Sequence, residues 1–232
     1  GEYALTERLG RGGMGTVYRA QRSNPDRTVA LKVLRGGDFA DENELRRFRS
    51  EAQLLAALHH PNIVPIYEYG EHAGGAWYTM RLMEGGTLAE AMPRLREHRD
   101  EACALLAVVA RAVHFGHQHA ILHRDLKPAN VLLDRNGVPS VADFGTARLL
   151  TDGRGLTNTN TLIGTPEYMA PEQASGNPEA VSVCADVYGL GAILYELLTG
   201  QPPHSAENRE ELLRRVADTE PVRPGMLVPG LE

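Results

Sequence analysis

The stretch His123-Arg124-Asp125-Leu126-Lys127-Pro128-Ala129-Asn130 carries the strongest signal in the sequence. Two further motifs follow it along the chain, Asp143-Phe144-Gly145 and then Ala170-Pro171-Glu172. Short strands are predicted around Asn130 to Leu133 and Ser140 to Ala142, so the stretch lies in a loop beside them. Independent motifs that occur together in one order are far more specific than any of them alone, and they decide the fold prediction.

Lysine is used at only two positions in this chain. Of the 24 Lys plus Arg residues, only Lys32 and Lys127 are lysine, and Lys127 lies inside the stretch quoted above. An ammonium is compact and flexible whereas a guanidinium is a planar fork, so the two side chains are not interchangeable. The pattern indicates that each lysine makes a specific contact, and the alternative is coincidence in an Arg-rich sequence.

A glycine-rich segment lies near the start of the chain, Gly10-Arg11-Gly12-Gly13-Met14-Gly15-Thr16-Val17-Tyr18. Glycines let a backbone approach phosphates because no Cβ intervenes and φ is unrestricted. The same pattern also occurs in dinucleotide-binding units and in plain hairpin turns. A dinucleotide-binding fingerprint needs a strand followed by a helix, whereas Thr16 to Gln21 alternates like a strand. By itself, this segment leaves a nucleotide site and a hairpin turn equally open.

Val29-Ala30-Leu31-Lys32 places Lys32 on a predicted strand beyond the glycine-rich segment. An alternating strand often carries an exposed lysine, which is the simpler interpretation. The functional interpretation needs a carboxylate partner on a helix, and Glu51 is the candidate. Glu51 lies one turn from Phe48 and Leu55, at the edge of an apolar helix face. A solvated Glu51 is the alternative.

The periodicity changes from strand-like to helical along the chain. In the first part we expect strands at Tyr3 to Leu9, Thr16 to Gln21, Thr28 to Leu34, Ile63 to Tyr69 and Ala76 to Leu82, with one helix at Asp41 to Leu58. In the second part we expect helices at Thr87 to Glu97, Glu101 to His119, Ala185 to Leu198 and Glu207 to Ala217. Gly200 is expected to end the third of these helices at its C-cap. The sequence therefore predicts a small β-rich part followed by a larger helical part.

Composition excludes some classes of protein. A formal charge of -6 argues against a nucleic-acid surface, which is normally basic. No apolar run approaches membrane-spanning length, and no signal-peptide pattern opens the chain. Because the first residue is Gly1 rather than Met, we expect an excerpt from a longer protein whose other parts could hold a membrane segment.

The two cysteines, Cys103 and Cys184, both lie in apolar stretches that are predicted to be helical. We expect buried free thiols rather than a disulfide, and hence a reducing compartment. Metal-ligand spacing is absent from this pair.

The motifs, in this order, resemble the protein-kinase signature set. The glycine-rich segment and Gly164-Thr165-Pro166-Glu167-Tyr168-Met169-Ala170-Pro171-Glu172-Gln173 are similar to bacterial Hanks-type (eukaryotic-like) Ser/Thr kinases. The resemblance runs from Leu9 to about Pro203. It implies an α+β, bilobal protein-kinase-like fold. Residues 1–83 would be the ATP-binding N-lobe, and residues 84–232 the catalytic and substrate-binding C-lobe, incomplete at its C-terminus.

The resemblance implies roles for the residues of the 123–130 stretch and its partners. Asp125 would orient the acceptor hydroxyl or take its proton, Lys127 would neutralise the γ-phosphate, and Thr165 would help to place both. Asn130 and Asp143 would bind Mg²⁺, or Mn²⁺ instead, because oxygen ligands suit a hard cation.

The resemblance also implies how ATP is held. Lys32 would contact the α- and β-phosphates and would itself be held by Glu51. The residues expected around the phosphates and the adenine are Leu9, Gly10, Gly12, Gly15, Val17, Ala30, Leu132 and the backbone of the linker from Arg81 to Met83.

Several positions depart from the family pattern or complete it. Arg81 stands where the family often has Glu, and Gly189 replaces a common Ser; we expect neither change to affect function. Asp186 resembles the buried Asp that braces the backbone of the 123–130 stretch. The family pairs the Glu172 carboxylate with an Arg from helices beyond residue 232. Without that Arg, Glu172 would lack its partner, and breaking a buried ion pair typically costs about 3–5 kcal/mol.

The polar loop from Thr151 to Thr165 is expected to be regulatory. A phosphate on it adds about -1.5 to -2 charges, and Arg124 is the natural partner for a bidentate contact. By resemblance, Thr157 and Thr159 are the expected sites, phosphorylated in trans by the kinase itself. The alternative is a Thr-rich linker without a role.

The sequence therefore predicts a cytoplasmic Ser/Thr protein kinase domain that uses ATP and Mg²⁺, with protein substrates and self-association for trans-autophosphorylation. No nucleic-acid partner is expected. One alternative is a kinase-like signalling scaffold, but its hallmark, loss of Lys32, Asp125 or Asp143, is missing. The other is a small-molecule phosphotransferase, which would usually lack the Ala170-Pro171-Glu172 segment.

Overall fold

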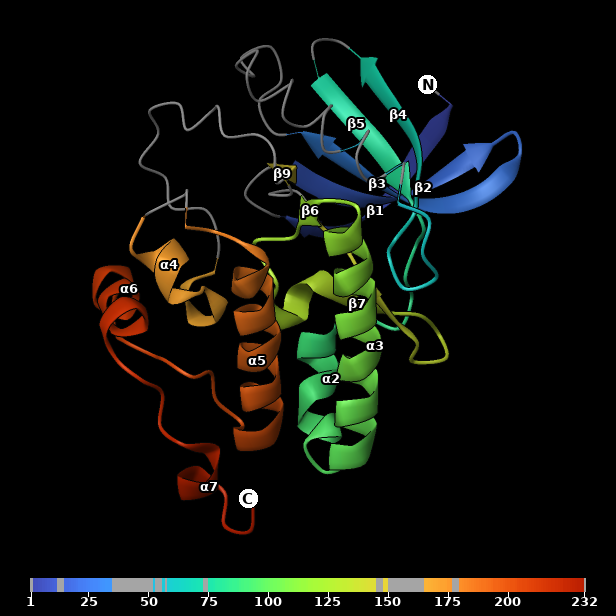
Figure 1. Ribbon diagram of the computed structural model, residues 1–232. Coiled ribbons are helices and arrows are strands. Elements are labelled where there is room, and N and C mark those ends of the chain that lie inside the picture. Colours follow the sequence, from blue (N-terminus) through green and yellow to red (C-terminus); the bar gives the residue numbers. More distant parts are fainter. Residues whose placement is uncertain are drawn as a thin grey trace. The chain divides into compact units, whose positions relative to one another are not determined.

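The computed structural model describes residues 2–11, 15–34, 52, 56, 58–72, 75–144, 148–149, 165–176 and 180–231. The chain forms two compact units, Gly1–Glu84 and Gly85–Glu232. Figure 1 labels most of the helices and strands of each.

The first unit is built on a five-stranded antiparallel sheet with the strand order β1-β2-β3-β5-β4. Its strands are β1 (Tyr3–Arg11), β2 (Gly15–Ser23), β3 (Asp26–Leu34), β4 (Ile66–His72) and β5 (Gly75–Met80). All five predicted strands are confirmed. The fourth starts at Ile66 rather than at Ile63, because Pro65 in between has no N–H to donate to a strand ladder.

The two faces of this sheet carry different residues because successive strand side chains point to opposite sides. On one face Ala20, Val29 and Leu31 are buried, with Tyr3, Val33 and Trp77 packed against them. The opposite face carries Ala30 and Lys32 of β3. Val17 of β2 is the cross-strand partner of Lys32 and therefore projects from the same face.

Gly15, at the start of β2, lies where two strands approach very closely. A Cβ atom at this position would come within 2.4 Å of the backbone oxygen of Val33. Any other residue here would force β3 to move, so sheet packing alone requires this glycine.

The second unit is mainly helical. Its helices are α2 (Leu88–Leu95), α3 (Arg99–Gln118), α4 (Pro171–Ala174), α5 (Val183–Thr199), α6 (Arg209–Asp218) and α7 (Pro224–Leu227). The long helices α3 and α5 run side by side (Figure 1). The buried residues of α3 recur every three or four positions, as in an amphipathic helix: Ala102, Leu105, Leu106, Val109, Ala112, Val113 and Gly116. Among the helices that the structure describes, none has both the length and the apolar character to cross a bilayer.

The ends of these helices follow from local sequence. Thr87 caps α2: its hydroxyl accepts the Glu90 N–H, and the Glu90 carboxylate accepts the Thr87 N–H in return, which is a capping box. The helix α5 stops at Gly200, whose φ of 85° is left-handed. Glycine adopts this conformation without steric cost, so the predicted C-cap is confirmed.

Short elements hold the two ends of the 123–130 loop. β6 (Ile121–Leu122) leads into it and pairs with β9 (Arg148–Leu149). The 3-10 helix η2 (Pro128–Asn130) and strand β7 (Val131–Leu133) lead out of it, and β7 pairs with β8 (Pro139–Val141). A second 3-10 helix, η3 (Pro166–Tyr168), precedes α4.

Two of the sequence predictions are met only in part. The cysteine prediction is half wrong, because Cys103 and Cys184 are free but exposed; the helices α3 and α5 turn these positions to solvent. The predicted helix at residues 41–58 lies mostly outside the described residues. Ala52 and Ala56 are helical there, and Leu58 is not.

Candidate functional site

The backbone that precedes Asp125 is held by a buried carboxylate. Asp186, in the first turn of α5, is only 1 % exposed. Its Oδ2 accepts the N–H of His123 at 2.8 Å, and its Oδ1 accepts the N–H of Arg124 at 2.7 Å. The predicted bracing contact of Asp186 is thereby confirmed.

His117, near the end of α3, is a third partner of the same carboxylate. Its Nε2 lies 2.8 Å from Asp186 Oδ2. Burial on its own raises the pKa of the Asp186 carboxyl, but the His117 hydrogen bond, the nearby His123 and the two backbone N–H groups outweigh it, and the pKa lies below its usual value. The carboxylate is therefore ionised in the folded protein and accepts hydrogen bonds from every partner.

The fully buried His123 connects the 123–130 loop to the segment that follows β8. Its Nδ1 accepts the N–H of Asp125 at 3.3 Å, so the ring proton is assigned to Nε2, which lies 3.0 Å from the oxygen of Ala142. The imidazole also packs on the ring of Phe144, with centroids 4.6 Å apart. This arrangement holds the Asp143 segment beside the loop.

Asp125 points its carboxylate at three donors. Lys127 Nζ lies 2.8 Å from Oδ2, and Asn130 Nδ2 lies 3.3 Å from the same oxygen. The Thr165 N–H donates to Oδ1 at 3.2 Å. Fixed donors on both oxygens orient the carboxylate, although it keeps partial contact with solvent.

Lys127 bridges two segments that are far apart in sequence. Its ammonium donates to Asp125 and also to the hydroxyl of Thr165, at 2.8 Å in each case. A flexible ammonium with three donors can serve both partners and retain one for a further acceptor. The three residues that were expected to act together, Asp125, Lys127 and Thr165, lie in direct contact.

Asn130 and Asp143 are brought close by the backbone. The Ala142 N–H, next to Asp143, donates to the main-chain oxygen of Asn130 at 2.8 Å. The Asn130 amide nitrogen donates to the Asp125 carbonyl at 2.8 Å, so its amide oxygen remains available as a ligand. An amide oxygen and a carboxylate suit a magnesium ion that takes its other ligands from phosphates and water. The donor set therefore fits a divalent metal.

In the first unit, Lys32 is 5 % exposed, which excludes the simple surface lysine. Its Nζ lies 5.5 Å from the centroid of the Tyr78 ring. A lysine is rarely buried without a paired anion. Lys32 shares its sheet face with Val17 and Ala30.

The structure also describes Leu9, Gly10, Arg81 and Leu132. Leu9 and Gly10 lie on β1, and a Cβ at Gly10 would meet nothing within 4 Å. The Arg81 N–H, in the linker from Arg81 to Met83, donates to the oxygen of Pro65 at 3.2 Å. Leu132 lies on β7 and is half-buried.

Other predicted residues lie outside the described part of the chain. They are Gly12, Glu51, Thr157 and Thr159.

Three residues that touch this region were not expected from the sequence. His117 is one of them. Gln173 of α4 donates to the oxygen of Arg124 at 2.9 Å. Glu196 of α5 accepts a 2.5 Å hydrogen bond from the hydroxyl of Tyr168, and burial, together with this carboxylate, raises the pKa of that phenol. For Gln173 the only sequence signal was its place directly after Ala170-Pro171-Glu172.

Gly189 has a tighter environment than its sequence suggested. A Cβ on Gly189 would lie 3.0 Å from Cβ of Leu126 in the 123–130 loop. Such contacts leave no slack, so the glycine lets α5 approach the loop closely. That the Ser-to-Gly difference leaves function unchanged stays a prediction.

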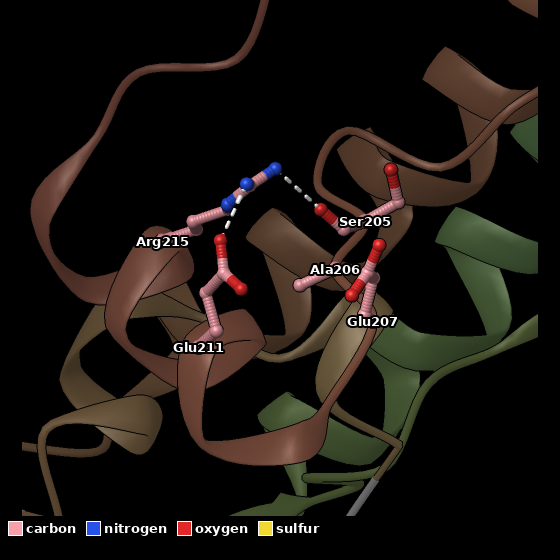
Figure 2. A pocket seen from close by; sticks show the side chains of 5 residues that line it. All are labelled: Ser205, Ala206, Glu207, Glu211 and Arg215. Carbon is pink, nitrogen blue, oxygen red and sulfur yellow. Dashed lines mark hydrogen bonds and ion pairs between the residues drawn. The ribbon is translucent and has the colours of Figure 1, made fainter.

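Two features of the second unit lie apart from the residues above. Within the described residues, no cation forms an ion pair with the Glu172 carboxylate. Figure 2 shows an open pocket next to α6, lined by Ser205, Ala206, Glu207, Glu211 and Arg215. There Arg215 donates to the Ser205 oxygen and to Glu211, so the charge of Arg215 is paired within the chain.

Residues 3–224 match the family model described as "Protein kinase domain". This chain belongs to that family. The α+β kinase fold expected from the motifs is thereby confirmed, and members of the family use ATP with a divalent cation and act on proteins.

Curated relatives agree with the bacterial resemblance. The kinase domain is 40% identical over 233 residues to serine/threonine-protein kinase PknB of Mycolicibacterium smegmatis, covering 96% of this chain and 36% of that protein. It is 41% identical over 218 residues to the DNA damage-responsive serine/threonine-protein kinase RqkA of Deinococcus radiodurans, covering 92% and 32%. It is 41% identical over 210 residues to serine/threonine-protein kinase PrkC of Bacillus subtilis, covering 90% and 32%. The chain thus spans about a third of the length of these relatives.

Proposed function

We propose that the protein containing this chain is a Ser/Thr protein kinase that transfers the γ-phosphoryl group of Mg-ATP to hydroxyls of protein substrates. Residues 1–83 would form the ATP-binding lobe, and residues 84–232 the catalytic and substrate-binding lobe. The choice of Ser/Thr over Tyr is supported by Lys127-Pro128-Ala129-Asn130, by Gly164-Thr165-Pro166-Glu167 and by the names of the relatives.

The observation that carries this proposal is the set of contacts around Asp125. Its carboxylate is oriented by Lys127, Asn130 and the backbone of Thr165, and a side chain held in this way is ready to act on a hydroxyl. Phosphoryl transfer needs mainly positioning and charge stabilisation. A scaffold that had lost catalysis would have no need to keep this arrangement.

In the proposed reaction, Asp125 accepts a hydrogen bond from the acceptor Ser or Thr hydroxyl and takes its proton as the oxygen attacks the γ-phosphorus. The bond from the γ-phosphorus to the bridging oxygen breaks, and ADP leaves with the electron pair. The third donor of Lys127 faces the transferred group and offsets its negative charge. A solvent molecule then removes the proton from Asp125.

ATP would be held mainly from the sheet face that carries Lys32. Lys32 would contact the α- and β-phosphates and be held by Glu51, and Gly10, Gly12 and Gly15 would cover the phosphates. The adenine would contact Leu9, Val17 and Ala30, with Leu132 and the linker from Arg81 to Met83. The low exposure of Lys32 and its place beside Val17 support this assignment.

The metal would be Mg²⁺, or Mn²⁺ in its place, held by the Asn130 amide oxygen and the Asp143 carboxylate. When bound, the cation neutralises charge on the phosphates of ATP. The left-handed backbone of Asp143, with φ 55°, sets the direction of its side chain. Because the rest of a magnesium shell comes from phosphates and water, two protein ligands suffice.

Regulation would come from phosphorylation of Thr157 and Thr159, carried out in trans by a second copy of the kinase. The phosphate would pair with Arg124, which lies directly before Asp125. This part of the proposal rests on the resemblance and on the position of Arg124.

The direct test uses the full-length protein, radiolabelled ATP and a mixture of candidate protein substrates, with phosphosites mapped by mass spectrometry. We expect phosphate on Ser and Thr, no transfer in EDTA, and recovery when Mg²⁺ or Mn²⁺ is added. Nucleotide binding without any transfer would instead favour a signalling scaffold, and transfer in EDTA would refute the metal-assisted mechanism.

A second experiment tests regulation. The Thr157→Ala/Thr159→Ala double variant should lose autophosphorylation of this loop and work more slowly than the wild type. If wild-type protein acquires no phosphate at either residue, or the double variant matches its rate, autoactivation through these residues is wrong.

A further inference from the structure

The residue directly before Asp125 has an unusual backbone. Arg124 has φ 67°, a left-handed conformation that is uncommon for a residue with a side chain, because the Cβ crowds the following carbonyl. Such a conformation persists only where neighbouring groups hold it. Because Arg124 and Asp125 share a peptide plane, the backbone of Arg124 also sets the direction of the Asp125 side chain.

Both polar groups of the Arg124 backbone are held by side chains from other elements. On one side, the N–H donates to Asp186 of α5 at 2.7 Å. On the other, the carbonyl oxygen accepts from Gln173 Nε2 of α4 at 2.9 Å. Asp186 was expected in this role, whereas nothing in the sequence analysis assigned one to Gln173.

The amide of Gln173 is engaged at both ends. While Nε2 donates to Arg124, Oε1 accepts the N–H of Ala170 at 3.0 Å. One partner is a backbone acceptor and the other a backbone donor, so their chemistry fixes the orientation of the amide. A carboxylate could replace only the acceptor half, and an apolar side chain could replace neither.

We propose that Gln173 is a positioning residue for Asp125, acting through the carbonyl of Arg124. This inference rests on the proposed kinase function, because it concerns how the proposed catalytic residue Asp125 is held in place. The segment from Thr165 to Gln173 then reaches Asp125 by two routes: directly, through the Thr165 N–H on its carboxylate, and indirectly, through Gln173. A displacement of this segment changes the direction of Asp125, which couples the segment to catalysis.

The test uses the full-length protein with Gln173→Glu, an almost isosteric change that keeps the acceptor and removes the donor. Gln201→Glu is the matched control, because Gln201 is exposed and takes no part in the site. We expect kcat of Gln173→Glu to fall about tenfold to a hundredfold, as small displacements of a reacting group do. KM for ATP should stay within about twofold, because ATP does not contact this amide.

A pH series separates positioning from a general loss of stability. The carboxyl introduced by Gln173→Glu can donate to the Arg124 oxygen once it is protonated. The ratio of variant to wild-type kcat should therefore rise as the pH falls from about 8 to about 6. Burial beside a carbonyl oxygen raises the pKa of the introduced carboxyl toward this range. The Gln201→Glu ratio should stay flat. Equal kcat in Gln173→Glu and wild type, or a ratio that does not change with pH, would overturn the proposal.

Hydrogen exchange provides a readout that does not depend on phosphoryl transfer. Amides of residues 121–127 should exchange faster in Gln173→Glu than in the wild type and the Gln201→Glu control, at equal Tm. Unchanged exchange would refute the tie through Gln173 even if the wild type proved inactive. An inactive wild type with faster exchange in the variant would refute the proposed function and leave the tie intact.

Discussion

The backbone N–H of Arg124 lies 2.7 Å from Oδ1 of Asp186, although the two residues are 62 positions apart in the chain. Asp186 also accepts the N–H of His123 on its other oxygen. One carboxylate on α5 therefore satisfies two consecutive backbone donors at the start of the 123–130 loop, and the loop depends on it for its shape.

Asp186→Asn should destabilise the protein. The new amide nitrogen would replace Oδ2, so the His123 N–H would lose its acceptor, and a buried donor without a partner costs about 1–3 kcal/mol. We expect that loss in the free energy of unfolding, measured with urea. Asp218→Asn, an exposed change at the end of α6, should stay within about 0.5 kcal/mol of wild type.

The stability of the wild type and that of Asp186→Asn should depend differently on pH. The folded pKa of Asp186 lies below its ordinary value of 3.8, so its contribution to stability is present above that value and is lost as pH falls through the folded pKa. The wild type should therefore lose its advantage over Asp186→Asn below about pH 4. If the difference in unfolding free energy between the wild type and Asp186→Asn stayed constant down to about pH 3, that result would contradict an ionised Asp186.

Asp125→Asn should abolish most of the turnover while ATP still binds. The amide cannot take a proton, and general-base catalysis typically contributes about 10²- to 10⁴-fold, so kcat should fall by that factor. The dissociation constant for ATP should change by no more than about threefold, because Asp125 acts on the acceptor. Asp134→Asn in the exposed turn after β7 is the control, and near-normal turnover in Asp125→Asn would rule out its assigned role.

Lys32→Arg should disable the enzyme despite keeping the charge. The side chain is buried, and a planar guanidinium cannot occupy the space or make the point contact of an ammonium. We expect kcat/KM for ATP to drop by more than about tenfold, since a misplaced phosphate contact commonly costs that much. Arg27→Lys, at the exposed start of the same strand, should leave kcat/KM unchanged; if Lys32→Arg does so too, Lys32 does not contact the phosphates.

Two glycines of α5 should respond in opposite ways to alanine. A Cβ at Gly191 would meet nothing within 4 Å, whereas a Cβ at Gly189 would press on Leu126 at 3.0 Å. Replacing glycine in a helix normally stabilises by about 1 kcal/mol, so Gly191→Ala should raise the Tm. Gly189→Ala should gain nothing or lose stability, and its kcat should fall because Leu126 is next to Asp125; equal gains in Tm at both positions would disprove this.

Most of the fold could be predicted from local pattern. The five strands of the sheet follow from alternation, and α5 ends where Gly200 predicted it would. The role of Asp186 came instead from the resemblance to the family's buried Asp, and it agrees with the need of a buried carboxylate for hydrogen-bond partners. Patterns of this kind work because they report which face of an element is buried.

The prediction of burial failed where apolar residues cover more than one face of a helix. On α5 the exposed positions Cys184, Val187 and Gly191 follow one another at helical spacing, but none of them is charged, so the outward face carries no signal. Gln173 and His117 were missed for a different reason. The partner of Gln173 is the oxygen of Arg124, and the partner of His117 is the Asp186 carboxylate. Both partners are far away in sequence, and only the packing of the helices and the loop brings them together.

Asp186 and Gln173 contact Arg124 through hydrogen bonds to its main-chain atoms. This has an evolutionary consequence. A lineage could replace the side chain at position 124 without releasing the backbone that aims Asp125. Control of the enzyme by a phosphorylated loop would depend on that side chain, and turnover would depend on the backbone. Natural selection could therefore add or remove such control by a single codon change, while the reaction itself continued unchanged.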